Sequence, residues 1–302
     1  LTDTNIEIRT SIIPESYGES IVLRILNPKT VAIPFEELGI EPQLLELLLQ
    51  EINKPNGMIL TTGPTGSGKT TTLYAFLKKK QSPDIKIITL EDPVEYNIDG
   101  VSQSQVRPEI GYTFATGLRS ALRQDPDIIL VGEIRDKETA QLAIQAALTG
   151  HLVFSTIHTN NVAGIIPRLV DMGVDPFLIA PTLVLGIAQR LVRTLCPDSG
   201  EPIPIEGSLK LMIEQQFEDL PQEYLEKLNL KGSVHKIKPS PNCPNGTRGR
   251  TAVVELLEMN DELEQVILNN PVENEVYNVA RKQGMLSMKE DAIIKSIQGI
   301  IP

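Results

Sequence analysis

The stretch that decides the fold of this chain is Gly63-Pro64-Thr65-Gly66-Ser67-Gly68-Lys69-Thr70. It fits the pattern G-x-x-x-x-G-K-[ST], which is typical of a loop that binds nucleotide phosphates. An apolar run, 58–62, comes before it, and a helix-compatible run, 71–77, follows. This order of strand, loop and helix is the context that the motif requires. The sequence therefore predicts a nucleoside triphosphate site, and the alternative is a glycine-rich turn without a ligand.

The residue types in this stretch have distinct expected roles. Glycines let successive backbone N–H groups point inward as a concave anion site, and the helix that starts near Lys69 adds its positive end. We expect Lys69 to reach the β- and γ-phosphates and the Thr70 hydroxyl to ligate Mg²⁺. The predicted nucleotide-binding residues are Gly63, Pro64, Thr65, Gly66, Ser67, Gly68, Lys69, Thr70 and Thr71.

Composition narrows the class of protein. The chain has 302 residues, of which 41% are hydrophobic, enough for one large domain or two smaller ones with a real core. Its formal net charge of −11 disfavours non-specific nucleic-acid binding, so we expect no nucleic-acid partner. The two cysteines, Cys196 and Cys243, are too few for a disulfide framework and indicate a reducing cytosol.

The start of the chain and its apolar stretches bear on whether it carries a signal peptide or a membrane-spanning segment. No signal peptide is visible at the start, and the chain begins at Leu1 without Met, so we expect it to be a piece of a longer protein. The longest apolar stretch, around 177–188, is interrupted by Pro181 and Gly186 and is too short to cross a bilayer. We therefore expect a soluble chain.

Hydrophobic patterning predicts an α/β protein. From residue 57 onward, apolar strand runs alternate with helical stretches, which favours a parallel sheet. Residues 5–26 are expected to form two strands at the end of a larger sheet, because two strands alone are not stable. The other predicted elements are a helix at 42–49, strands at 85–90, 128–131 and 152–154, a helix from its N-cap Asp136 to Gly150, a helix at 209–217 within a Pro- and Gly-rich insert, and helices over 255–298.

Two of the predicted strands end on acidic residues. Glu91 closes the strand at 85–90, and Glu133 follows the strand at 128–131. Ligands bind at the carboxyl ends of parallel strands. We expect Glu133 to support Mg²⁺ through water or to polarise the attacking water; the alternative is a surface acid at the start of a loop. Glu91 either coordinates metal through water or caps the next turn.

The strand at 152–154 leads into a polar run that contains His158, at the same end of the sheet. His158 is expected to hydrogen-bond a γ-phosphate or to relay its loss. His151 precedes the strand and should lie at the opposite end, where a structural role and a functional one are equally open. With His235, these are the only histidines, and their spacing supports no zinc site.

Taken in order, these motifs resemble the secretion superfamily ATPases, in the branch of type II secretion and type IV pilus assembly. The resemblance covers nearly the whole chain. The matching segments are 18–24 near the end of an N-terminal domain, 63–70 as Walker A, 90–96 as the acidic box, 118–127 with 132–136 as the family signature and Walker B, 149–160 as the histidine box, and 189–193.

The resemblance implies a RecA-like P-loop NTPase core with a parallel central sheet, a C-terminal helical subdomain and the end of a preceding N-terminal α+β domain. The expected division of the chain is 1–28 as the C-terminal part of an N-terminal PAS-like domain, 29–56 as linker and helix, 57–195 as the ATPase core, 196–250 as an insert resembling a degenerate four-cysteine zinc subdomain, and 251–302 as the helical subdomain.

The resemblance also implies a hexameric ATPase motor that uses ATP and Mg²⁺ at the cytoplasmic face of the inner membrane. Its partner would be a membrane platform protein, and only partners would attach it to the membrane. In such motors, arginines of the N-terminal domain are thought to reach phosphates, often those of a neighbouring subunit. The matching positions are Arg9 and Arg24, with Arg119 and Arg123 ranked lower. An arginine supplied in this way is worth about 10³–10⁵ in rate; the alternative is a surface arginine that pairs with a local acid.

One departure from the family concerns zinc. The family usually carries two C-x-x-C pairs, but here they are Cys196 with Ser199 and Ser240 with Cys243. Serine is a poor zinc ligand, and two thiolates do not complete a tetrahedral site, so we expect no tightly bound zinc. Whether packing or a Cys196–Cys243 contact orders the insert stays open. The insert itself argues against the pilus retraction branch.

The sequence thus predicts an ATP-hydrolysing motor that powers type IV pilus assembly. The alternatives are a type II secretion ATPase and a nucleotide-gated assembly module with little turnover. A nucleic-acid translocase on a RecA-like core is disfavoured by the negative charge and by the match over 118–136.

Overall fold

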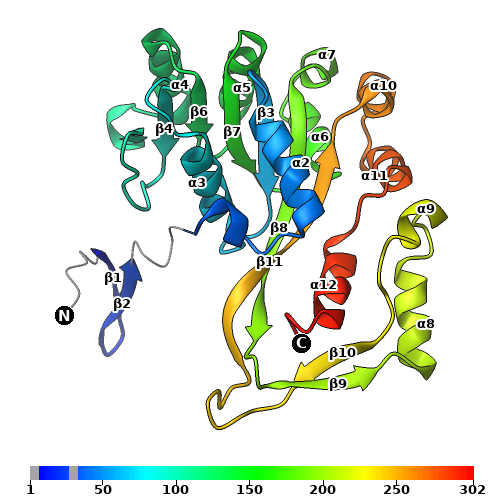
Figure 1. The fold of residues 1–302 in the computed structure, drawn as a ribbon. Helices are drawn as coiled ribbons and strands as arrows, with labels where there is room; N and C mark the ends of the chain where they lie inside the picture. The colour runs from blue at the N-terminus through cyan, green and yellow to red at the C-terminus, as the bar shows by residue number, and fades with distance from the viewer. Residues whose placement is uncertain (1–6, 27–32) are drawn as a thin grey trace.

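The computed structural model describes residues 7–26 and 33–302, without the side chains of Glu7, Arg24 and Leu26 (Figure 1). In this part of the chain, seven strands form the main sheet in the order β11-β8-β3-β7-β6-β4-β5. All neighbours are parallel except the pair β8–β11. The strands are β3 (Gly57–Thr62), β4 (Ile87–Glu91), β5 (Ser102–Gln105), β6 (Ile128–Val131), β7 (Leu152–Ile157), β8 (Leu183–Leu195) and β11 (Thr247–Glu258).

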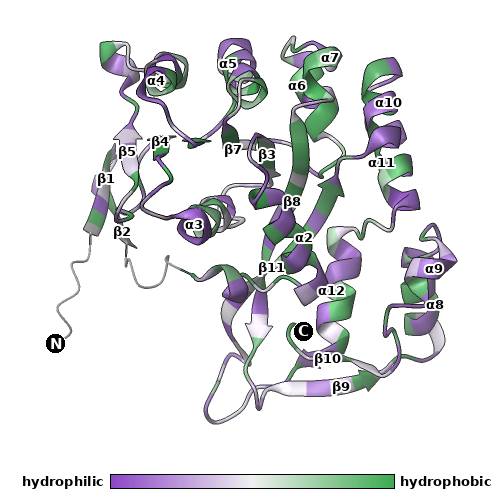
Figure 2. Cartoon of the chain, turned by 45° about the horizontal axis from the view of Figure 1, so that its top comes forward, coloured by the Kyte–Doolittle hydropathy of each residue, from purple (hydrophilic) through white to green (hydrophobic). Residues whose placement is uncertain are grey.

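Helices cover both faces of the sheet (Figure 1). Every residue of β3, β6 and β7 is buried, as expected for parallel strands with both faces covered. Successive residues point to opposite faces, so Met58 and Leu60 join one apolar core while Ile59 joins the other. The hydrophobic residues accordingly gather along the strands (Figure 2). The predicted α/β fold with a parallel central sheet is confirmed.

Each face has its own set of helices. The core that contains Ile59 also holds residues of α2 (Pro42–Ile52) and α3 (Lys69–Lys80), together with the short η1 (Phe35–Glu37). The opposite core holds residues of α4 (Phe114–Ala121), α5 (Lys137–Leu148), α6 (Ile165–Asp171) and α7 (Pro176–Ile179). Two further single turns, η2 (Pro108–Ile110) and η3 (Leu122–Gln124), flank α4.

The predicted helix at 136–150 is confirmed as α5. The Asp136 side chain accepts the Thr139 N–H at 2.8 Å and so caps the first turn. Gly150, with φ of 110°, follows the last turn in the left-handed region. The helix predicted at 42–49 and the strands predicted at 85–90, 128–131 and 152–154 are present as α2, β4, β6 and β7.

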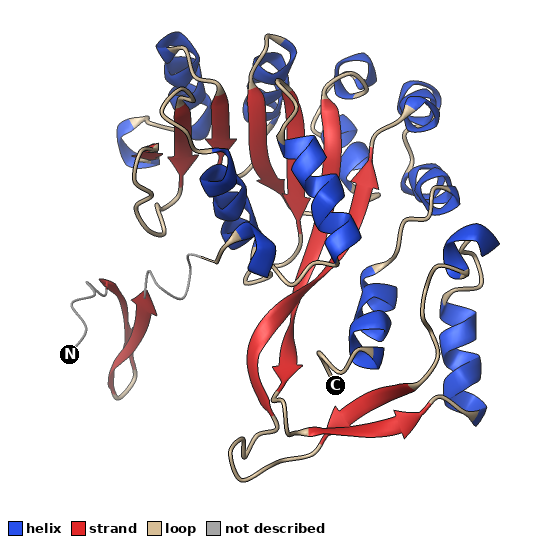
Figure 3. Cartoon of the chain, in the orientation of Figure 1, coloured by secondary structure: helices blue, strands red, loops and turns tan. Residues whose placement is uncertain are grey.

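The strands β8 and β11 extend well beyond the rest of the sheet (Figure 3). The first half of β8 pairs with β3, and the second half pairs only with β11 among the described strands. The helical pattern expected from residue 255 is wrong at its start, since residues 255–258 belong to β11. Helices begin only at Asp261, as α10 (Asp261–Asn269), α11 (Glu273–Lys282) and α12 (Met288–Ile297).

The insert between β8 and β11 has its own small core. It comprises β9 (Gly200–Pro204), α8 (Gly207–Gln216), α9 (Gln222–Leu225) and β10 (Ser233–Ile237), and β9 pairs with β10. Ile213, Phe217 and Leu220 are buried there and pack against Ile293 and Ile294 of α12. The helix predicted at 209–217 is therefore confirmed as α8.

The N-terminal residues form a hairpin of β1 (Glu7–Glu15) and β2 (Gly18–Leu26), as predicted for the part that the structure describes. Residues 1–6 and 27–32, including most of the predicted linker around Pro28, lie outside the described residues. That the hairpin belongs to a larger domain, and the division of the chain at 57, 196 and 251, stay predictions. Within the described residues, none of the helices combines the length and the apolar character that a bilayer crossing requires.

A buried ionic cluster joins the C-terminal helices to the insert. Arg281 of α11 donates to Glu290 of α12 at 2.8 Å and to Asp219 of the insert at 2.7 Å, and it also donates to the Met285 carbonyl at 2.7 Å. Arg281 is 4% exposed and Glu290 is fully buried. Removing the arginine would leave the Glu290 carboxylate buried without its partner.

We predict that Arg281→Met lowers the free energy of unfolding by about 3–5 kcal/mol, because breaking a buried ion pair strands a charge. Urea denaturation measures this change. The matched control is Arg248→Met at an exposed position of β11, which we expect to change the free energy by no more than about 0.5 kcal/mol. Equal effects of the two substitutions would contradict the prediction.

Candidate functional site

The loop that follows β3 is tightly curled at the carboxyl edge of the sheet. Gly63 and Gly68 adopt φ of 138° and 92°, values that side-chain-bearing residues rarely reach. The Ser67 N–H donates to the Pro64 carbonyl at 3.2 Å, and α3 begins at Lys69. The predicted residues 63–71 therefore form one continuous loop and helix start, whose tip and Thr70 are exposed.

Lys69 reaches back over this loop. Its ammonium donates to the carbonyls of Gly63 at 2.7 Å and Pro64 at 3.1 Å. Burial lowers the pKa of Lys69, and the negative charge of Glu133 partly opposes that shift. The ammonium thus lies at the mouth of the loop beside an acid, where it can exchange carbonyl oxygens for phosphate oxygens.

Glu133 is held in the loop after β6. The Gly132 N–H donates to the Leu90 carbonyl at 2.7 Å, and the Ile134 N–H donates to the Thr156 carbonyl at 2.8 Å. These bonds fix the backbone on both sides of Glu133 between β4 and β7. Its side chain is only 13% exposed, so the carboxylate lies at the edge of the site rather than in open solvent.

His158 lies beside the same carboxylate. Its Nε2 is 3.4 Å from the Glu133 carboxylate, and the imidazole is half exposed. The neighbouring Thr159 donates its N–H to the Thr62 hydroxyl at 2.8 Å, which ties the histidine loop to the last residue of β3. The structure therefore brings Glu133 and His158 into contact from two loops, and the charge of Glu133 acts on Lys69 at the start of α3. His151 instead contacts the Ala146 carbonyl at 2.8 Å, at the other end of β7.

Arg135, which was not among the predicted site residues, also contacts Glu133. Its Nε lies 2.6 Å from the Glu133 carboxylate, and the side chain is largely exposed. The only signal was a basic residue two positions after the acid that follows β6, within the run 132–136. This ion pair and the His158 contact both engage the same carboxylate oxygen of Glu133, and its second oxygen can still accept a hydrogen bond.

Glu91 is enclosed in a different network. Its carboxylate is 3% exposed and accepts hydrogen bonds from the hydroxyl of Tyr74, from Thr89 at 2.5 Å and from the Gln103 amide at 3.1 Å. Burial, followed by the charge of Glu91, raises the pKa of Tyr96 to about 12 and raises that of Tyr74 further. These contacts tie β4 to α3 and β5, and coordination of a metal by Glu91 would require some of them to be exchanged.

The predicted arginines are spread over several elements. Arg9 of β1 donates to the Val94 carbonyl at 2.8 Å and lies 3.4 Å from the Glu95 carboxylate, so the hairpin is attached to the segment after Glu91. Arg24 stands opposite Arg9 in the β1–β2 ladder, and its side chain lies outside the described residues. Arg119 pairs with Glu138, and Arg123 donates to the Ser120 hydroxyl at 3.3 Å.

The residues at the loop fit a nucleotide with Mg²⁺. Thr70 is exposed at the start of α3 and would offer its hydroxyl to the ion, and Glu133 would contact the ion through water. Among the described residues, there is no group of three or more His, Cys, Asp or Glu side chains that could hold a metal ion by itself. Magnesium is therefore expected to arrive with the nucleotide, whose phosphates would share its coordination with protein oxygens and water.

The four positions that replace the family's zinc ligands do come together in the insert. Cys196 and Cys243 form a disulfide, and the Ser199 hydroxyl donates to the Ser240 hydroxyl at 3.1 Å. Composition alone indicated a reducing compartment, yet here the two cysteines are paired. With both sulfurs bonded to each other, no thiolate is free to bind a metal, so this donor set does not fit zinc.

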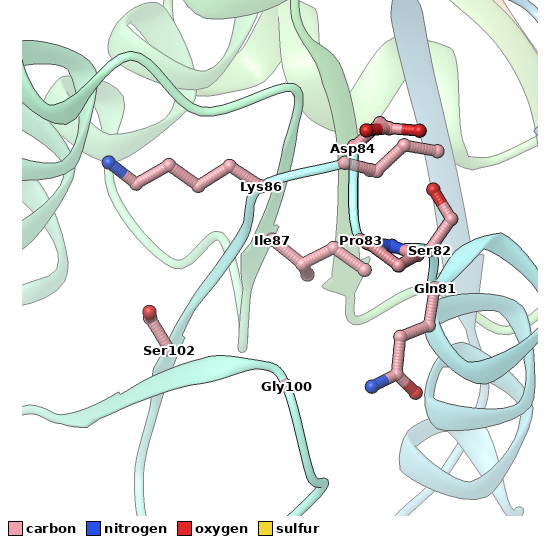
Figure 4. Close-up of a pocket in the computed structure, with 9 residues that line it drawn as sticks. Gln81, Ser82, Pro83, Asp84, Lys86, Ile87, Gly100 and Ser102 are labelled. Atoms are coloured by element: carbon pink, nitrogen blue, oxygen red, sulfur yellow. The ribbon is translucent and has the colours of Figure 1, made fainter.

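A hollow of about 670 Å³ lies at the amino end of β4. It is lined by 81–87, Gly100 and Ser102, and Figure 4 shows the Lys86 ammonium pointing away from the other lining groups. Since the glycine loop follows the carboxyl end of β3 in a parallel sheet, this hollow is at the opposite edge. It contributes none of the residues that surround Lys69.

Known proteins similar to this chain agree with the motifs. The sequence profile of the family described as "Type II/IV secretion system protein" matches residues 1–301. The type II secretion system protein E of Xanthomonas campestris is 45% identical over an alignment of 300 positions, which covers 97% of this chain and 50% of that protein. The type IV pilus assembly ATPase PilB of Acinetobacter baylyi is 43% identical over 295 residues, which are 98% of this chain and 50% of that protein.

A solved structure shares the fold. The pilus retraction motor PilT with bound ADP superposes with a TM-score of 0.63 at 27% identity, covering 95% of this chain and 73% of that one. The chain spans about half the length of the two curated relatives described above. The likeness confirms the predicted RecA-like core, and the activity of a whole motor is a matter for proposal.

We predict that Ser199→Cys/Ser240→Cys restores a zinc site. Under reducing conditions, four thiols then stand where the disulfide and the serine pair stand now, and four thiolates complete a structural zinc site. Metal analysis of the purified variant should give about one zinc per chain. The control Ser199→Ala/Ser240→Ala should hold none, and a reduced parent chain that carries stoichiometric zinc would contradict the account.

Proposed function

This chain belongs to the Type II/IV secretion system protein family, and we propose that it is the ATP-hydrolysing part of a motor in that class of machine. The observation that carries the proposal is the Glu133–His158 contact at the carboxyl edge of the sheet, together with Lys69 of the glycine loop, on which the charge of Glu133 acts. Phosphoryl transfer to water uses three kinds of group: a cation that binds phosphate, here Lys69; an acid that acts on water, here Glu133; and a group that carries a proton, here His158.

The residues divide the work of hydrolysis as follows. The loop amides and Lys69 hold the β- and γ-phosphates, with Lys69 exchanging its two carbonyl partners for phosphate oxygens. Bound Mg²⁺ supplies positive charge beside Thr70. Water attacks the γ-phosphorus, a new P–O bond forms, the bond to the β–γ bridging oxygen breaks, and ADP leaves. Glu133 orients that water and takes its proton, while His158 contacts the γ-phosphate.

The motor is proposed to work as a homo-hexamer at the cytoplasmic face of the inner membrane, attached through a platform protein and without a nucleic-acid partner. The machine is proposed to be a type IV pilus in its extension phase. Type II secretion is the second candidate, because the type II protein E of Xanthomonas campestris is 45% identical to this chain against 43% for the pilus ATPase of Acinetobacter baylyi.

A chromosomal Lys69→Ala allele in the source bacterium separates these two machines. Loss of surface pili with normal export of secreted enzymes supports the pilus assignment. Loss of export with normal piliation supports type II secretion instead, because the loop lysine is required for either motor to bind ATP productively.

We predict that Glu133→Gln lowers Mg-ATP hydrolysis by about 10²-fold or more, while nucleotide binding persists. The amide keeps the size of the side chain but accepts no proton. Phosphate release and nucleotide titration on the same preparations measure both effects. Glu109→Gln, at an exposed acid in η2, is the control and should hydrolyse ATP normally. A parent chain that binds ATP but does not hydrolyse it, even when concentrated enough to assemble, would instead support the nucleotide-gated module.

We predict that Arg9→Ala lowers the rate of ATP hydrolysis by at least about tenfold, since an arginine that reaches phosphate stabilises the transition state. The comparison variant is Glu95→Ala, which removes the same ion pair but leaves the arginine in place. Hydrolysis by assembled protein should fall only for Arg9→Ala. If both variants lose activity equally, the ion pair within the chain accounts for Arg9, and its phosphate role is wrong.

A further inference from the structure

The back of the phosphate loop rests on one side chain of β8. Gln189 directly follows Ala188, which pairs with Thr62 at the end of the β3–β8 ladder. Gln189 is 2% exposed. It begins the run 189–193, to which the site described above assigns no role. A polar side chain buried so completely has to find hydrogen-bond partners, and both of its partners belong to the loop and its helix.

The Gln189 amide uses both of its ends. Its Nε2 donates to the Ser67 carbonyl at 2.9 Å, and its Oε1 accepts from the Thr72 hydroxyl at 2.8 Å. Ser67 lies in the middle of the loop and Thr72 in the first turn of α3, and both are buried. One amide therefore fixes the loop relative to the helix whose positive end faces the phosphates.

Two glycines of the loop allow this close contact. A Cβ added to Gly63 would lie 2.3 Å from the Gln189 carbonyl oxygen, and one added to Gly68 would lie 2.7 Å from its Nε2. The loop is thus pressed against Gln189 near both of its ends. Protein therefore supports the loop on the side that faces β8, and an anion would bind on the opposite side.

We propose that Gln189 is a positioning residue of the nucleotide site, which holds the loop in its phosphate-accepting shape. This inference rests on the proposed function. It also connects the loop to the C-terminal elements, because Gln189 pairs with Val254 of β11, and the Val254 N–H donates to Asp291 of α12 at 2.8 Å.

The test measures the dissociation constant of Mg-ADP for three variants beside the parent chain. Gln189→Leu removes both hydrogen bonds and leaves two buried groups unpaired, so the constant should rise about tenfold. Gln283→Leu is the matched control, since the Gln283 amide nitrogen is buried without a hydrogen-bond partner among the described residues and lies in the C-terminal helical region. It should bind Mg-ADP as the parent does.

Gln189→Glu separates positioning from a merely structural role. At pH 8 the carboxylate cannot donate to the Ser67 carbonyl, and binding should be weakened at least as much as in Gln189→Leu. Burial raises the pKa of a carboxyl group, so lowering the pH to 6 increases the protonated fraction, which again has a donor for the Ser67 carbonyl. The deficit relative to the parent, measured at each pH, should therefore shrink as the pH falls, whereas that of Gln189→Leu should stay constant.

The outcomes are distinguishable. If the parent binds Mg-ADP and both Gln189 variants bind it equally well, the inference is overturned and the proposed function stands. A deficit in Gln189→Glu that does not change with pH also overturns it. If the parent itself binds no nucleotide, the proposed function fails and this inference fails with it. Gln189→Glu preserves the shape of the side chain and carries the test even where Gln189→Leu does not fold.

Discussion

The site depends on a steric constraint at the end of β3. The chain must turn tightly there and must also accept the backbone of β8 against one side of the turn. Gly63 and Gly68 satisfy both demands, because they take up positive φ and leave no Cβ to collide with Gln189. The direction of α3 and the place of Lys69 follow from this turn.

The parallel sheet then supplies the other chemical groups. The carboxyl ends of β3, β6 and β7 lie at one edge, so the loops that follow them converge there without any further device. Hydrogen bonds from Gly132 to Leu90 and from Thr159 to Thr62 hold these loops to neighbouring strands. Glu133 and His158 therefore approach Lys69 from a rigid frame, which suits a reaction governed by positioning and charge.

Sequence reasoning succeeded where the signal is local. The loop at 63–70 is a contiguous motif between a strand run and a helix run, and Asp136 with Gly150 marks both ends of α5. The secondary structure was predicted wrongly where it depends on pairing with a strand that is distant in the chain. The run 251–258 fits a strand or a helix by its pattern, and only pairing with β8 makes it β11.

The same reason explains what was missed in the site. Tyr74 and Gln103, which enclose Glu91, come from α3 and β5, and no spacing rule connects them to an acid at the end of β4. The Glu133–Arg135 ion pair is local, but the run 132–136 does not reveal which way the arginine turns. The pairing of Cys196 with Cys243 likewise depends on the fold of the insert around them.

The most direct test of the whole account is a crystal structure of this chain with Mg²⁺ and a non-hydrolysable ATP analogue. The account predicts the phosphates inside the loop at 63–70, the Lys69 ammonium moved from the Gly63 and Pro64 carbonyls to phosphate oxygens, and the Thr70 hydroxyl on the metal. A nucleotide bound elsewhere, or a Lys69 that keeps both carbonyl partners with nucleotide present, would contradict it.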